Sequence, residues 1–170
     1  MISGLLQRPK PLLAASLILA AAVFGLAGAW TFQWLGYEPC ELCLKERTAF
    51  YAALPIATAA IFLARNARPA YARAALALLA AIFAANAALA FYHAGVEWKL
   101  WAGPADCTGA FAQPATMEEF RRQLQHVHVV RCDEPALKLL GLSLAFWDFV
   151  LSSLLALLAV AAATSKSSKP

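Results

Sequence analysis

Long apolar stretches without charged residues alternate with polar segments along this chain of 170 residues. The hydrocarbon core of a bilayer is about 30 Å thick, which needs roughly 20 apolar residues in a helix that rises about 1.5 Å per residue. Four stretches approach that length, at about residues 11–30, 48–64, 74–92 and 142–164. The pattern therefore predicts an all-α membrane protein, a single four-helix bundle that occupies the whole chain.

Two residues interrupt the apolar pattern inside the expected spans. Pro55 lies in the second span and Asn86 in the third. A proline or a polar side chain at membrane depth needs neighbouring helices to satisfy the backbone or side-chain groups that it exposes. We therefore expect both residues to face the inside of the bundle.

Composition agrees with a membrane protein and excludes one alternative. The chain is 62% hydrophobic and only 14% charged, far from the balance of a soluble domain. The formal charge of +4 comes from basic residues scattered singly or in small groups. Nucleic-acid binding is excluded on this basis because it needs a basic stripe or patch.

Basic residues near the span ends set the expected orientation, because Arg and Lys in short loops resist transfer across the membrane. They precede the first span, crowd the second connection and follow the last span, which places both termini in the cytoplasm. The loops at about 31–47 and 93–141 then lie outside, and the ten acidic residues fall in these loops or beside them. The deciding basic residues are Arg8, Lys10, Arg65, Arg68, Arg73, Lys166 and Lys169.

The first span has a second interpretation, a secretory signal with a small-residue cleavage site at Ala27-Gly28-Ala29. Its apolar run of about 20 residues is longer than a typical signal core, and cleavage would leave an odd number of spans. We interpret it as a membrane anchor.

Four cysteines form a close pair, Cys40 and Cys43, and a wide pair, Cys107 and Cys132. Both pairs fall in the outer loops, in the compartment where disulfides form and persist. Structural zinc sites usually have two close pairs, so the wide spacing of the second pair argues against zinc, and we expect no metal. All four cysteines are candidate redox groups.

The close pair immediately precedes the second span. A cysteine at the start of a helix gains from the positive end of the helix dipole, which stabilises a thiolate, and the sequence favours Cys43 for that position. Arg47 then lies one turn further along the same face, where its guanidinium can bind an anion or a carbonyl oxygen. The alternative is a loop-closing disulfide with Arg47 reaching toward lipid phosphates. We interpret Trp30, Gln33 and Trp34 as interfacial belt residues.

The long second loop carries the wide pair among polar residues, so we expect Cys107 and Cys132 to be exposed. A disulfide between them would stabilise the loop by roughly 3 kcal/mol, which is the structural alternative to a redox role. A capping box at Thr116 predicts a short amphipathic helix within the loop. His93 follows the third span directly and is either an interfacial proton carrier or a histidine at the headgroup boundary.

The run Pro39-Cys40-Glu41-Leu42-Cys43 with Glu46-Arg47 resembles the Pro-Cys-x-Leu-Cys…Glu-Arg signature of the disulfide bond formation protein B family. The resemblance extends to the four spans, the loop sizes and the wide cysteine pair. Tyr92-His93, Gly141-Leu142 and Trp147 match the family pattern more loosely.

This resemblance implies a thiol:quinone oxidoreductase of the bacterial inner membrane with its cysteines on the periplasmic side. Electrons would enter at the wide pair from a soluble thioredoxin-fold oxidase of the periplasm (DsbA-like), which would attack Cys107. Cys132 would relay them to Cys40, and Cys43 would face ubiquinone or menaquinone from the membrane pool. Arg47 would orient the quinone, with His93 nearby.

Alternatives of two kinds, catalytic and non-catalytic, stay open from the sequence. One is a dedicated oxidase for a single specialised partner, or an enzyme similar to vitamin K epoxide reductase, although that family usually carries its close pair at the end of a late span. The other is a membrane scaffold without catalytic activity, whose disulfides only stabilise loops.

Overall fold

The computed structural model describes residues 10–104, 107, 116–118, 121 and 131–165. Within these residues, four helices are long and apolar enough to cross a membrane, which confirms the predicted all-α, four-span fold. The predicted amphipathic helix lies for the most part outside the described residues. The elements are α1 (Pro11–Trp34), α2 (Glu41–Arg65), α3 (Pro69–Glu97), β1 (Lys138–Leu139), β2 (Leu142–Ser143) and α5 (Leu144–Ala163).

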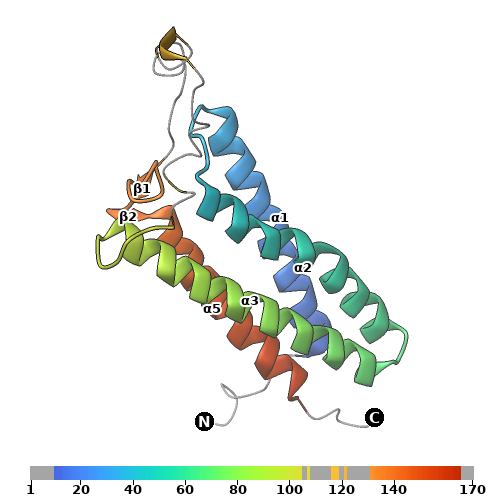
Figure 1. Ribbon diagram of the computed structural model, residues 1–170. Helices are drawn as coiled ribbons and strands as arrows, with labels where there is room; N and C mark the ends of the chain where they lie inside the picture. Colours follow the sequence, from blue (N-terminus) through green and yellow to red (C-terminus); the bar gives the residue numbers. More distant parts are fainter. Residues whose placement is uncertain (1–9, 105–106, 108–115, 119–120, 122–130, 166–170) are drawn as a thin grey trace.

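The helices run side by side, and their ends form two distinct regions (Figure 1). The start of α1, the α2–α3 connection and the end of α5 lie at one end of the bundle, where Arg73 donates a hydrogen bond to the carbonyl oxygen of Ser165. The α1–α2 connection, the end of α3 and the β1–β2 hairpin lie at the other end. The cysteines and the basic α2–α3 connection are therefore separated by the length of the bundle.

Small residues allow the helices to approach closely. Ala14, Ala53, Ala57 and Ala159 have no exposed surface and belong to one apolar core that all four helices share. Such small side chains permit the close backbone packing on which membrane bundles depend. The most extensive contacts join α3 with α5, and α2 with both α1 and α3.

The helices are longer than the charge-free stretches predicted. The second begins at Glu41 instead of residue 48, and the third runs from Pro69 to Glu97 instead of 74–92. Absence of charge marks the apolar part of a span and gives no information about where the helical hydrogen bonds stop. The extra turns matter because they place Cys43, Glu46, Arg47 and His93 on helices.

Asn86 and Pro55, the two residues that interrupt the apolar pattern, differ in their burial. Asn86 is buried, as predicted. Pro55 is exposed on the outer face of α2, so the expectation that it faces the bundle is wrong. Its ring lies on the exposed side of the helix, where it does not need a neighbouring helix to pack against.

A tight hairpin leads into α5. Leu140 and Gly141 connect β1 to β2 with positive φ angles of 54° and 83°, as a two-residue hairpin turn requires. Ser143 then caps α5 by accepting a hydrogen bond from the backbone N–H of Phe146.

Candidate active site

The close cysteine pair forms the first turn of α2. Cys40 is the N-cap, and its sulfur accepts a hydrogen bond from the backbone N–H of Cys43 at 3.3 Å. The two Sγ atoms are 3.0 Å apart and both thiols are free. Cys43 lies in this first turn, close to the predicted helix start, but the N-cap position itself belongs to Cys40.

The surroundings of Cys40 favour its thiolate. The hydrogen bond between the two thiols is the largest cause that lowers its pKa, and a hydrogen bond with His93 acts in the same direction. Burial opposes both, yet the pKa falls from 9.0 to about 4. Cys40 is therefore a thiolate at neutral pH when the pair is reduced.

His93 links Cys40 to a carboxylate. Its Nε2 lies 3.5 Å from the sulfur of Cys40, and its Nδ1 lies 2.8 Å from Oε1 of Glu46. His93 and Glu46 are both buried, at 1% and 6% exposure. The imidazole therefore lies inside the bundle between a thiol and a carboxylate, which favours the proton-carrier interpretation of His93. Such an imidazole can receive a proton from one group while the other orients its ring.

Cys40, Cys43 and His93 could also ligate a metal. The sulfur atoms of Cys40 and Cys43 and a ring nitrogen of His93 lie within 4.8 Å of one another. Thiolate and imidazole are ligands that zinc prefers, and Glu46 would orient the histidine through its hydrogen bond with Nδ1.

The wide pair forms a disulfide that packs against the close pair. Cys107 and Cys132 are bonded, with Cα atoms 5.4 Å apart, and are 5% and 2% exposed. They share a buried cluster with Cys40 and Leu42. The expectation that they are exposed is wrong, since polar sequence neighbours do not prevent the sulfurs from packing on the end of the bundle.

Ion pairs hold the segment around Cys132 to the end of α3. Lys99 donates to the backbone carbonyl of Asp133 at 2.9 Å and also contacts its carboxylate. Arg131 donates two hydrogen bonds to the same carboxylate, at 2.9 and 2.8 Å. Hydrogen bonds from Arg131 and then Lys99 hold the pKa of Asp133 well below its usual range.

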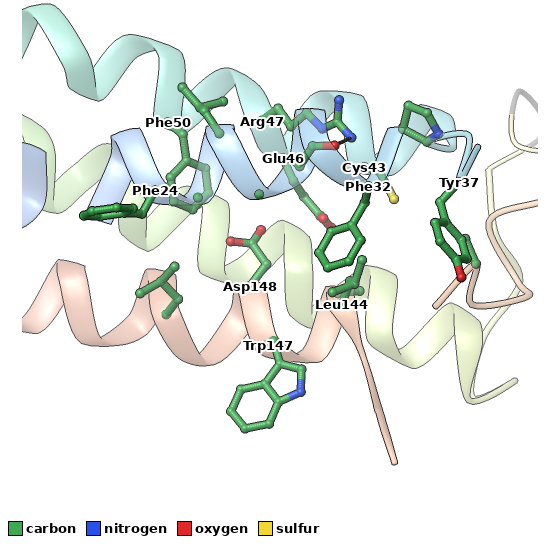
Figure 2. Close-up of a pocket in the computed structure, with 18 of the residues that line it drawn as sticks. Phe24, Phe32, Tyr37, Cys43, Glu46, Arg47, Phe50, Leu144, Trp147 and Asp148 are labelled. Atoms are coloured by element: carbon green, nitrogen blue, oxygen red, sulfur yellow. Dashed lines mark hydrogen bonds between the residues drawn. The ribbon is translucent and has the colours of Figure 1, made fainter. Parts of the chain in front are cut away.

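A cavity of about 330 Å³ opens beside Cys43, between α1, α2 and α5. Its lining is mainly apolar and aromatic, and Figure 2 shows Cys43, Glu46, Arg47 and Asp148 around it. Gly28 lies on its α1 wall, where an added Cβ would meet no atom within 4 Å. An apolar pocket of this size with a few polar groups is typical of small-molecule sites.

Arg47 reaches this cavity from α2 and is held by α1. Its guanidinium donates to Oε1 of Gln33 at 2.8 Å and to the carbonyl oxygen of Ala29 at 3.3 Å. Gln33, interpreted from the sequence as a belt residue, therefore positions Arg47. Trp30 does lie at the exposed surface, where its indole N–H donates to the hydroxyl of Tyr51.

Sequence reasoning missed two acidic residues of this region. Glu46 was part of a motif but had no assigned role, and Asp148 was counted with the polar loop although it lies in the second turn of α5. An acidic residue followed by a long apolar run is a signal that could have singled out Asp148, because acids inside spans are rare and functional.

The arrangement is consistent with comparisons to known proteins. Residues 11–162 match the model of the family described as "Disulfide bond formation protein DsbB". A protein of Rickettsia prowazekii (strain Madrid E), named only as uncharacterized, is 22% identical over 138 residues, which cover 79% of this chain and 77% of that protein. No solved structure matches the chain. The family match includes all four cysteines and nearly all of the four spans.

Proposed function

The chain belongs to the DsbB family of disulfide-forming membrane oxidoreductases, and from that premise we propose that it transfers electrons from a periplasmic dithiol partner to a membrane quinone. The partner is a soluble thioredoxin-fold oxidase, DsbA-like, which this protein restores to its disulfide form. The membrane is the bacterial inner membrane, with the cysteine end of the bundle in the periplasm and both termini in the cytoplasm.

One observation supports this proposal above the others. The two cysteine pairs share a buried cluster, and one of them adjoins an apolar cavity through Cys43. A scaffold whose disulfides only stabilise loops needs neither a second pair packed against the first nor a cavity beside free thiols. A chain of thiol–disulfide exchanges that ends at a lipid-soluble acceptor needs both.

The first steps are exchanges between sulfur atoms. A thiolate of the partner attacks Cys107, which forms a mixed disulfide and releases Cys132 as a thiolate. The second thiol of the partner resolves the mixed disulfide, so the partner leaves oxidised and the wide pair is reduced. Cys132 then attacks Cys40 in the close disulfide, and closure of the wide disulfide by Cys107 leaves both close thiols reduced.

The cavity fits the head of ubiquinone or menaquinone. Its apolar and aromatic walls suit a flat ring, the open space at Gly28 leaves room for one, and Arg47 offers N–H groups to a carbonyl oxygen. When bound, the quinone would be the oxidant that accepts two electrons and two protons. The close pair provides both electrons as its disulfide forms again.

The residues around the close cysteine pair accept its protons and place a positive charge beside the cavity. His93 accepts a proton from Cys40 at Nε2, while Glu46 fixes the ring through Nδ1. Arg47, anchored to Gln33, keeps its guanidinium at the cavity wall. Cys43 is the sulfur that lines the cavity and therefore the one that faces the acceptor.

Oxidation of a reduced thioredoxin-fold partner by the purified protein in detergent, with a soluble quinone analogue, tests this proposal. We expect continuous oxidation of the partner together with loss of quinone absorbance in equal amounts. Partner oxidation that stops after one or two disulfide equivalents, with the quinone untouched, would contradict it. Comparison of several thioredoxin-fold partners separates a general oxidase from one dedicated to a single partner.

A further inference from the structure

An acidic side chain reaches the cavity from the helix opposite the cysteine pair. Asp148 lies on α5 and points into the space that Cys43 and Arg47 approach from α2 (Figure 2). A carboxyl group at this depth is costly, and acids inside spans mark proton or substrate paths in membrane proteins.

Two buried polar residues hold this carboxyl group. Asn86 Nδ2 donates to Oδ2 of Asp148 at 3.0 Å, and the hydroxyl of Ser152 donates to Oδ1 at 3.1 Å. Asn86 also donates to the hydroxyl of Ser152 at 3.0 Å, so the three side chains form one closed cluster between α3 and α5. Asn86 is 4% exposed and Ser152 has no exposed surface.

Asp148 takes part in none of the ion pairs found within the part of the chain that the structure describes. Arg47 lies on the same cavity, but the hydrogen bonds described for its guanidinium go to Gln33 and Ala29. Two neutral donors suffice to hold a carboxylate briefly, after a proton has left, without fixing it permanently as an anion.

We propose that Asp148 carries a proton at a carboxyl oxygen and donates it to the acceptor bound in the cavity. This inference rests on the proposed quinone function and identifies the proton donor on the α5 side. A purely structural bond between α3 and α5 would need only an acceptor for Asn86, and a neutral amide or hydroxyl would serve. A titratable group that also lines the cavity serves proton transfer.

The protons and electrons balance without another reactant. Oxidation of the two close thiols to a disulfide releases two electrons and two protons, and reduction of a quinone to a quinol consumes the same number. Asp148 gives one proton and later recovers one of the two that the thiols release. His93 and Glu46 hold the other, Glu46 on the α2 wall of the cavity and His93 hydrogen-bonded to it from α3.

Infrared difference spectroscopy detects this proton directly. The reduced protein, labelled with carboxyl-¹³C aspartate, is compared before and after addition of a soluble ubiquinone analogue. We expect a label-sensitive band of a protonated carboxyl group that changes during the reaction and is absent from Asp148→Asn. Asp133→Asn is the control, because that carboxylate lies in an exposed ion pair outside the spans and should leave the band in place. A wild-type spectrum without a label-sensitive carboxyl change overturns the proposal, whether or not Asp148→Asn folds.

Single-turnover kinetics provide the second readout. Asp148→Asn keeps the shape of the side chain and one of its two accepting oxygens but cannot donate a carboxyl proton, so quinone reduction should slow by about 10²-fold. Binding of the analogue and exchange between the cysteine pairs should stay nearly unchanged. Ser152→Ala removes two hydrogen bonds of the cluster, the one donated to Asp148 and the one accepted from Asn86, but it keeps the acid, so its effect should be much smaller. A normal rate in Asp148→Asn overturns this inference alone, whereas a wild-type protein that never reduces quinone overturns the proposed function.

Discussion

The sulfur of Cys40 lies 3.5 Å from Nε2 of His93, although 53 residues separate them in the sequence. The contact exists because the first turn of α2 packs against the last turns of α3, and it extends to Glu46 through the other ring nitrogen. The thiol that caps α2 therefore has a hydrogen-bonding imidazole on one side and a second thiol on the other. Both lower its pKa.

The reactivity of Cys40 toward a small alkylating reagent should follow this lowered pKa. In the reduced protein we expect the rate to stay constant from pH 8 to about pH 5 and to fall only as the pH drops through about 4, where the thiolate becomes protonated. Mass spectrometry of the peptide that contains Cys40 gives the rate. In Cys43→Ala the largest cause of the shift is lost, so the fall should move to higher pH. An unchanged profile in that variant would refute the role of the thiol pair.

The proposed series of thiol–disulfide exchanges requires each of the four cysteines at a different step. Serine at Cys40, Cys43, Cys107 or Cys132, one at a time, should abolish steady-state oxidation of the partner, because every sulfur has its own exchange step. Full turnover in Cys107→Ser would contradict the assignment of that sulfur to the partner.

Loss of the wide disulfide should leave the membrane fold intact. Removing it costs about 3 kcal/mol in the chain-entropy model, whereas the four spans pack through their own apolar core. Circular dichroism and yield of Cys107→Ser and Cys132→Ser in detergent should match the wild type. Collapse of the helical signal would instead favour the scaffold interpretation.

Apolar length and basic flanks sufficed to predict the four spans because membrane insertion depends on those same properties. Contacts between helices were not predictable in this way. The pairing of Glu46 with His93 depends on the register of α2 against α3, which no local pattern contains. Asp148 was missed because a search for charge-free stretches excludes a charged residue that a neighbouring helix satisfies. The sulfurs of Cys107 and Cys132 looked exposed because their sequence neighbours are polar, yet they pack against Cys40 and Leu42.

Filling the cavity should impair quinone use without disturbing the thiols. Gly28→Leu adds a side chain where a Cβ meets no atom within 4 Å, so it should enter the cavity and not strain the helix. We expect the KM for quinone to rise at least several-fold and exchange between the cysteine pairs to continue. Ala20→Leu, on the exposed face of the same helix, is the matched control and should behave as the wild type. Equal effects of the two substitutions would mean that the cavity is not the quinone site.

Arg47 should act on the quinone and not on the protein partner, because its guanidinium lies at the cavity and the wide disulfide lies in a separate segment. Arg47→Ala removes a charged hydrogen-bond donor, worth roughly 1.5–3 kcal/mol, so the KM for quinone should rise about tenfold or more. Arg47→Lys keeps the charge but loses the planar fork that bridges to Gln33 and Ala29, so its recovery measures how much geometry matters. Gln33→Leu keeps the guanidinium and removes one of the two groups that anchor it, so it should give an intermediate KM. The rate at which the partner attacks Cys107 should be the same in all three variants. Normal quinone dependence combined with a slower attack by the partner would place Arg47 in the partner interface instead.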